Sequence, residues 1–322
     1  MIPAMRRLPF TAGKGLLLAL ALVSCAAAQS PAPASGPDQG FTLSLPVNEV
    51  SLTFHVSDAG GAPITNLSQR DVALFDNGTP QDRIAEFQVY RDLPVRAGIL
   101  MDTSLSTVGS AARDVEIASD YLARNFRKAT DRAFVMRFDV ETHLERDWSA
   151  NPGILADGLQ AAAHEAGKGA DGTAIFDSIY KACRDQWPGD SGTVTGNFIL
   201  LFTDGLDNES HARIADVIDR CQRSRTAIYV FLDEWRTRGS LGQETLEELV
   251  AKSGGRMFYQ PNNKALEQDL VMIENDIRSQ YRMTYKIPEL KRDGSFHRIK
   301  LECPAKRCEV LTRSGYYAAT RH

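Results

Sequence analysis

Four short, nearly continuous apolar runs in the middle of the chain constrain the fold most. They are VRAGILM at 95–101, AFVMRF at 133–138, NFILLF at 197–202 and AIYVFL at 227–232. Runs of this kind are typical of strands that are covered on both faces in a parallel sheet. Helical patterns separate them; the pattern at 110–127 places every third or fourth residue on one apolar face. Strands that alternate with helices predict an α/β fold, a doubly wound and mostly parallel sheet.

The remaining elements of this region follow the same alternation. We expect a strand near 142–148, a short strand at 256–259, and helices at 154–165, 174–186, 214–223, 244–252 and 265–280. The α/β domain is thus predicted to span residues 94–281.

Both ends of the chain carry strand patterns instead. In the segment 41–93, Val50, Leu52, Phe54 and Val56 alternate with other residues, and the Asn77-Gly78 pair marks a turn. The segment 282–322 contains further strand-like runs. We therefore expect a small β-rich module in which 282–322 packs with 41–93, so that the α/β domain interrupts it.

The N-terminus predicts export. Basic residues precede the apolar run LLLALALV and the small residues SCAAAQS, as in a secretory signal. Two readings stay open: cleavage after Ala28, which makes 1–28 the signal, or a lipoprotein signal to residue 24 with a lipid tether on Cys25. The Pro- and Ala-rich segment 29–40 then forms a flexible tether. The chain is expected to be secreted, periplasmic or an outer-membrane lipoprotein.

Composition and cysteines support this. With 24% charged residues and a net charge of −4, nothing points to a nucleic-acid partner. Besides Cys25, four of the five cysteines remain, and an even number in an exported chain favours disulfides. Cys303–Cys308 is the favoured pair, whereas Cys183 and Cys221 are either a disulfide or two buried free thiols.

Polar residues follow two of the apolar strands. Asp102, with Ser104 and Ser106 behind it, ends one strand, and Asp204 ends another; Thr173 opens a helix. Each has an ordinary reading, because serine and threonine cap helices and aspartate occupies turns. Strand-to-helix loops of an open α/β sheet share one edge, however, where ligands bind. Capping predicts no such convergence.

The donor types predict a hard cation. Two carboxylates and three hydroxyls suit Mg²⁺ or Mn²⁺ and are poor ligands for zinc or copper. The neutral hydroxyls leave the ion electrophilic, so that an acidic side chain of another protein displaces one of its waters.

These residues match a known pattern. The order Asp102-Thr103-Ser104-Leu105-Ser106, then Thr173, then Asp204-Gly205, resembles the D-x-S-x-S…T…D metal-ion-dependent adhesion site (MIDAS) of von Willebrand factor type A domains. The flanks NLSQRDVALFDNGTPQ, SQYRMTYKI and RSGYYA resemble exported von Willebrand type A-related proteins common in Acidobacteria. The resemblance implies a Rossmann-like fold in which Ser104, Ser106 and Thr173 bind the ion directly, and Asp102 and Asp204 often through water. Leu105 departs from it, because many members have glycine there.

Three functions compete. The preferred one is a binding module that bridges its metal to an Asp or Glu of a protein partner, without enzymatic activity. The second is an envelope scaffold with a structural metal. A hydrolase is disfavoured, because His143, His164 and His211 form no recognisable arrangement with the serines and G-x-S-x-G is absent. The oligomeric state and the partner's identity stay open.

Overall fold

The computed structural model describes residues 49–187, 194–232, 241–259, 263–287, 293–304 and 308–318. The expected signal, the expected tether 29–40, Cys25 with its two alternative fates and the start of the expected β-rich module lie outside them. In the described part of the chain, no helix is long and apolar enough to span a membrane.

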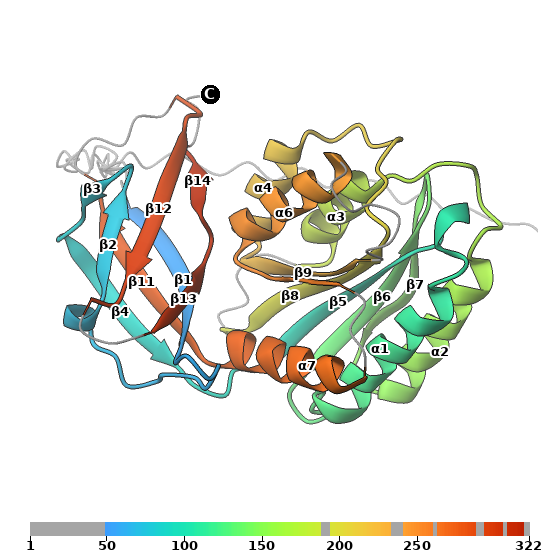
Figure 1. Ribbon diagram of the computed structural model, residues 1–322, viewed down its shortest axis with the longest axis horizontal. Helices are drawn as coiled ribbons and strands as arrows, with labels where there is room; N and C mark the ends of the chain where they lie inside the picture. Colours follow the sequence, from blue (N-terminus) through green and yellow to red (C-terminus); the bar gives the residue numbers. More distant parts are fainter. Residues whose placement is uncertain are drawn as a thin grey trace, which may run out of the picture. The chain divides into compact units, whose positions relative to one another are not determined.

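A six-stranded sheet forms the centre of the α/β domain (Figure 1). Its order is β10-β9-β8-β5-β6-β7, and all neighbours are parallel except β7, which runs antiparallel to β6. The fold-class prediction of a mostly parallel sheet is confirmed. The strands are β5 Val95–Asp102, β6 Arg132–Phe138, β7 Thr142–Ser149, β8 Gly196–Thr203, β9 Thr226–Leu232 and β10 Met257–Tyr259.

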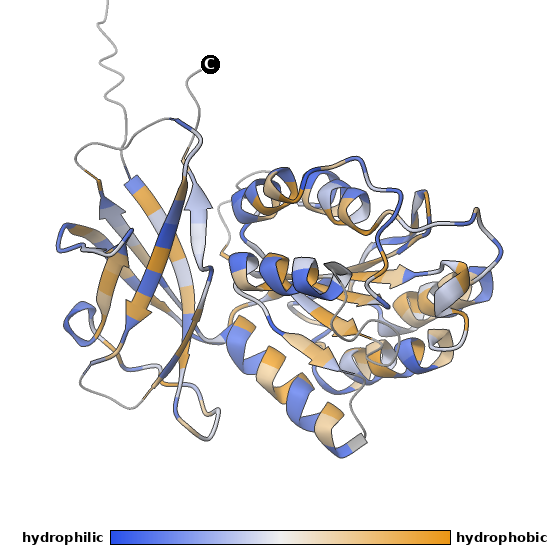
Figure 2. Cartoon of the chain, turned by 45° about the horizontal axis from the view of Figure 1, so that its top comes forward, coloured by the Kyte–Doolittle hydropathy of each residue, from blue (hydrophilic) through white to orange (hydrophobic). Residues whose placement is uncertain are grey.

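Helices cover both faces of this sheet, as a doubly wound fold requires. One apolar core joins the sheet to α1, α2 and α7, and a second joins it to α3, α4 and α6 (Figure 1). The helices combine hydrophilic and hydrophobic bands, so each buries one stripe (Figure 2). They are α1 Ala111–Arg124, α2 Pro152–Glu165, α3 Ile175–Asp185, α4 Ile214–Arg223, α6 Leu241–Ser253 and α7 Asn263–Arg278.

Strands from both ends of the chain share two further four-stranded sheets, ordered β13-β1-β11-β4 and β14-β12-β2-β3. A common core of apolar side chains lies between them. The N-terminal strands are β1 Glu49–Ser57, β2 Ala73–Asp76, β3 Thr79–Pro80 and β4 Ile84–Tyr90, with a 3₁₀ turn at Gln69–Asp71. The C-terminal ones are β11 Gln280–Lys286, β12 Phe296–Glu302, β13 Glu309–Thr312 and β14 Gly315–Tyr317.

The passage from α7 to β11 lies slightly earlier than the sequence indicated. The helix ends at Arg278, and Tyr281, placed above in the α/β domain, pairs with Phe54 in the first sheet of the β-rich module. Its ring stacks on that of Phe54 with centroids 5.2 Å apart. Burial of this aromatic pair ends the helix before Tyr281, because the next residues gain more from pairing with β1.

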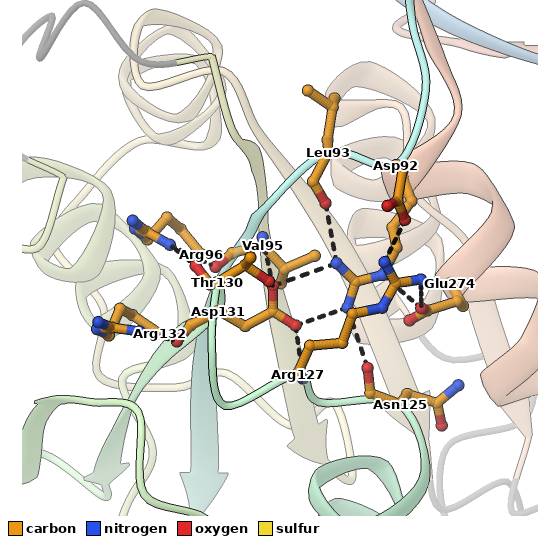
Figure 3. A network of polar contacts seen from close by, with 11 residues as sticks. Asp92, Leu93, Val95, Arg96, Asn125, Arg127, Thr130, Asp131, Arg132 and Glu274 are labelled. Carbon is orange, nitrogen blue, oxygen red and sulfur yellow. Dashed lines mark hydrogen bonds and ion pairs between the residues drawn. The ribbon is translucent and has the colours of Figure 1, made fainter.

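A buried ion pair fixes the C-terminal end of α7 (Figure 3). The Arg278 guanidinium donates to both carboxylate oxygens of Asp131, at 2.6 and 3.2 Å, and to the carbonyl oxygen of Leu93 at 2.8 Å. The backbone amides of Val95 and Arg127 complete the carboxylate at 3.0 and 2.8 Å. Because Asp131 is 0% and Arg278 3% exposed, the pair is shielded from water.

The predicted disulfide forms, and so does the one that the sequence left open. Cys303 pairs with Cys308, and Cys183 on α3 pairs with Cys221 on α4, which resolves the alternative that the sequence left open. Cys183 and Cys221 are fully buried between their helices. Two disulfides are typical of proteins that fold outside the reducing cytoplasm.

Replacing Cys183 and Cys221 together by alanine is expected to lower the free energy of unfolding by about 2–4 kcal/mol, because the unfolded chain loses a closed loop. Urea denaturation measures it. The matched Cys303→Ala/Cys308→Ala variant, whose loop spans only 5 residues rather than 38, should lose less. Free thiols in the denatured, unreduced wild-type protein would contradict the pairing.

Candidate metal centre

Four of the five predicted ligands lie at the carboxyl edge of the central sheet or in the loops leaving it, and the fifth, Thr173, lies in the connection between α2 and α3. Asp102 is the last residue of β5, and Asp204 directly follows the neighbouring strand β8. Ser104 and Ser106 lie in the loop after β5, their hydroxyl oxygens 3.2 Å apart. Thr173 precedes α3.

The capping interpretation of the three hydroxyls does not hold. Ser104 begins a 3₁₀ turn, Leu105–Thr107, without a side-chain cap bond, and α1 begins only at Ala111. The backbone amide of Ile175 in α3 is capped by Asp207 at 2.7 Å, not by Thr173. The hydroxyl groups of the site are therefore not needed to start either helix.

A dense set of hydrogen bonds fixes the loop after β5. The Ser104 amide donates to Asp102 Oδ1 at 3.0 Å, and the Thr203 hydroxyl donates to Asp102 Oδ2 at 2.6 Å. Thr107 donates its hydroxyl to the carbonyl oxygens of Asp102 and Ser104, at 2.9 and 3.0 Å. Both oxygens of Asp102 thus have a donor, and its position is set by two strands.

Asp204 is different, because one of its oxygens has no donor. The side chain is 1% exposed, and Oδ1 accepts from the Leu206 amide at 3.1 Å. Oδ2 is buried without a hydrogen-bond partner among the described residues. A buried polar atom without a partner costs about 1–3 kcal/mol. Such an atom fits a site that is completed by a cation.

The electrostatics of Asp102 agree with this. Burial raises its pKa, hydrogen bonds from Thr203 and Ser104 oppose the rise, and the nearby charge of Asp204 adds to it, giving about 7. Two buried carboxylates near one another resist ionisation together, and a bound cation relieves the conflict by favouring the charged forms.

The loop that carries Thr173 depends on glycine. Gly172 has φ +123°, and a Cβ added there would lie 2.5 Å from Cγ of Glu209. Asn208 then holds the loop. Its side-chain Oδ1 accepts from the Thr173 backbone amide at 2.7 Å, and its backbone amide donates to the Thr173 carbonyl oxygen at 3.0 Å. The loop that follows β8 and the loop that precedes α3 are therefore held together.

Three supporting residues were missed from the sequence: Thr203, Asp207 and Asn208. The cluster TDGLDNES contains all of them, but its polar residues read equally well as a surface turn. Only the pairing of this loop with the start of α3 gives them their roles.

The site opens to solvent through a pocket of about 440 Å³ with an apolar rim. Leu105 is 66% and Leu206 42% exposed, although both are large apolar side chains. The lining residues are Ser104, Leu105, Ser106, Asp171, Gly172, Thr173, Leu206 and Asn208.

The described residues contain no group of three or more His, Cys, Asp and Glu side chains placed to hold a metal ion. The donor set is instead two carboxylates with three hydroxyls, which fits a hard divalent cation that keeps several waters. Neither Ser104 nor Ser106 hydrogen-bonds a histidine within the described part of the chain.

No family model and no curated protein matches the sequence. Solved structures show a weak likeness. Proximal thread matrix protein 1 from the mussel byssus, with a zinc-occupied MIDAS motif, is 14% identical over 63% of this chain and 50% of its own, with a TM-score of 0.47. BatB from Bacteroides thetaiotaomicron is 15% identical over 56% and 97%, with a TM-score of 0.44.

The von Willebrand factor domain of the type V pili tip protein Mfa5 from Porphyromonas gingivalis is 22% identical over 36% of this chain and 39% of its own, with a TM-score of 0.29. The chain spans about half the length, 49%, of the mussel protein in a second crystal form. The function therefore has to follow from the residues of the site.

Proposed function

We propose that this chain is an exported binding module of the von Willebrand factor type A kind, which captures a protein partner through a divalent cation. Asp102, Ser104, Ser106, Thr173 and Asp204 hold Mg²⁺, or Mn²⁺, and an Asp or Glu side chain of the partner completes its coordination. The observation that carries this is the buried Asp204 Oδ2, which no described residue satisfies.

The contacts of Asp102 support a positioning role. With both oxygens already accepting hydrogen bonds, it orients the loop after β5 and would face the ion through water. The Ser104, Ser106 and Thr173 hydroxyls are the direct ligands. When bound, the cation supplies an electrophilic centre for an incoming carboxylate. The pocket above it leaves room for that carboxylate.

Export and partner class rest on other features. The disulfides favour an extracytoplasmic location, and the basic, apolar and small-residue N-terminus favours a signal or a lipid on Cys25. The weak likeness to a byssus matrix protein with a MIDAS motif and to a pilus tip domain is consistent with adhesion. We propose no enzymatic activity.

The deciding experiment is capture from native envelope extract on the immobilised chain, with Mg²⁺ and with EDTA, beside a Thr173→Ala variant. A partner retained only with Mg²⁺, and only by the wild-type protein, supports the metal bridge. Equal capture under all conditions, combined with Mg²⁺ binding measured by calorimetry, would favour the scaffold with a structural metal instead.

Replacing Leu105 by glycine is expected to leave Mg²⁺ affinity within about twofold, because the side chain is 66% exposed, and to lower stability by no more than about 1 kcal/mol, the cost of glycine's backbone freedom. Its loss removes apolar rim surface, so partner capture should change while metal binding does not. Calorimetry and thermal denaturation measure the first two quantities. A large loss of Mg²⁺ affinity would show instead that Leu105 shapes the coordination itself.

A further inference from the structure

A second cavity, of about 210 Å³, lies at the other end of the central sheet. Asn197 and Thr226, near the starts of β8 and β9, line it, whereas the metal centre follows the ends of β5 and β8. Its opposite wall is one face of the sheet that contains β1 and β13, with Thr53, His55 and Arg313. Cavities between two packed parts of a protein are frequent ligand sites.

His55 offers an unused acceptor to this cavity. The residue is 3% exposed, and its Nδ1 lies 2.7 Å from the carbonyl oxygen of Ser279, which can only accept, so Nδ1 carries the proton. Burial lowers the pKa of His55, so the ring is neutral and Nε2, which carries no proton, can accept a hydrogen bond. Nε2 has no hydrogen-bond partner among the described residues, and Asp276 Oδ1, also an acceptor, lies 3.6 Å away. Both residues line the cavity, so a hydroxyl group of a ligand there would supply the missing donor to Nε2.

Arg313 offers the opposite chemistry. Its Nη2 donates to the Ser51 carbonyl oxygen at 2.9 Å and its Nη1 to Gln222 Oε1 at 3.3 Å, and its Cζ lies 5.6 Å from the centre of the Tyr316 ring. Nε is buried without an acceptor among the described residues. Among the described residues no carboxylate pairs with this guanidinium. The charge of Asp276 is already matched by Arg256, at 2.7 and 3.1 Å. An anion is therefore the missing partner of Arg313.

The register places both groups on one face. Phe54 lies opposite Thr312, so His55 and Arg313 are diagonal neighbours across β1 and β13. Diagonal pairs lie roughly 7–8 Å apart at the backbone. A molecule of a few carbon atoms spans that separation. The cavity has room for such a ligand, because its volume equals that of about seven water molecules. It is smaller than the roughly 300 Å³ at which sites for drug-sized molecules begin, which favours a small ligand.

We propose that this cavity binds a small hydroxylated carboxylate, whose hydroxyl group donates to His55 Nε2 and whose carboxylate accepts from Arg313. The arrangement selects against molecules that have only one of the two groups. Arg225, an exposed residue at the same cavity, adds a second positive charge. The site is independent of the metal centre.

Calorimetry of the full chain with glycerate, malate and gluconate tests the proposal. EDTA is present throughout, because hydroxy acids also chelate a bound metal. At least one of the three should bind with a Kd below about 10 mM, and glycerol and propionate should each bind at least about tenfold more weakly. The proton resonances of the His55 ring should shift on binding.

Two variants keep the test independent of folding. Arg313→Gln removes the charge, and Thr53→Ile fills space in the cavity without altering any charge. Each should weaken binding at least about tenfold, or about 1.4 kcal/mol. Arg298→Gln, which changes an exposed arginine on β12, should bind as the wild type does. Absence of binding by all three acids, or equal binding by Arg313→Gln, overturns the proposal.

Discussion

Replacing Asp131 by asparagine is expected to lower the free energy of unfolding by about 3 kcal/mol, because it removes the fully buried one of the two carboxylates that pair with the Arg278 guanidinium and leaves only the partly exposed Glu274. Arg278 is 3% exposed and cannot recover the lost interaction from water. The change also weakens the bonds that Asp131 accepts from the Val95 and Arg127 amides (Figure 3). Urea denaturation followed by circular dichroism measures the loss.

A surface ion pair supplies the control. Asp120 lies 3.6 Å from Arg124 on α1, and both side chains are at least one-third exposed. Asp120→Asn should therefore cost less than about 1 kcal/mol. Similar losses for the two variants would mean that burial adds nothing to the Asp131 pair.

The same pair predicts acid sensitivity. Burial alone would raise the pKa of Asp131, but hydrogen bonds from Arg278 and the backbone amides outweigh it and lower the pKa. Its stabilising contribution is therefore complete above the unfolded value of about 3.9 and is lost as the pH falls through the lower folded value. Denaturation midpoints of the wild type and Asp131→Asn should converge as the pH falls below 4. A constant difference would contradict this assignment.

The second large effect is expected at Asp204, and its sign depends on the metal. With Mg²⁺ at 100 times its Kd, the wild type should gain about 2.7 kcal/mol of stability, whereas Asp204→Asn should lose at least about 100-fold in affinity and gain almost nothing. In EDTA the order reverses. The variant removes one charge of a buried carboxylate pair and an acceptor without a partner, so it should be about 1 kcal/mol more stable than the wild type.

Asp171→Asn is the matched control, since Asp171 is an exposed carboxylate that lines the same pocket. It should bind Mg²⁺ within a few-fold of the wild type and show no stabilisation in EDTA. Thermal denaturation with Mg²⁺ and with EDTA gives both quantities. If Asp204→Asn destabilises the protein in EDTA and Mg²⁺ has the same effect on both proteins, the carboxylate is structural.

The central sheet could be predicted because its strands are apolar on both faces, whereas the helices that cover it are apolar on one face only. This difference is visible in short stretches of sequence, and β5, β6, β8 and β9 each show the two-sided pattern. The proximity of Asp102 and Asp204 could also be predicted from the sequence, because the carboxyl ends of parallel strands lie at the same edge of a sheet. The disulfide between α3 and α4 required knowing that two helices lie side by side, which no local pattern encodes.

Other parts of the sites depend on long-range packing alone. Asp207 caps α3 from 32 residues away in the sequence, and His55 hydrogen-bonds the carbonyl oxygen of Ser279, which is 224 residues away. In the sequence, His55 sits in an ordinary alternating strand, and nothing marks its ring as buried. The start of β11 shows the same limit, because the helical pattern of α7 continues into residues that tertiary pairing makes a strand.

The two connections between the β-rich module and the α/β domain also have a mechanical consequence. Leu93, before β5, and Arg278, at the end of α7, are clamped to one another: the Leu93 amide donates to the Arg278 carbonyl at 3.1 Å, and the Arg278 side chain donates back at 2.8 Å. Under the proposed function, a pull between β1 and a partner bound at Asp102 and Asp204 would enter the α/β domain through these two connections. The load is divided between two covalent paths and runs along the length of β5, the direction in which its ladders with β6 and β8 must shear together before they part.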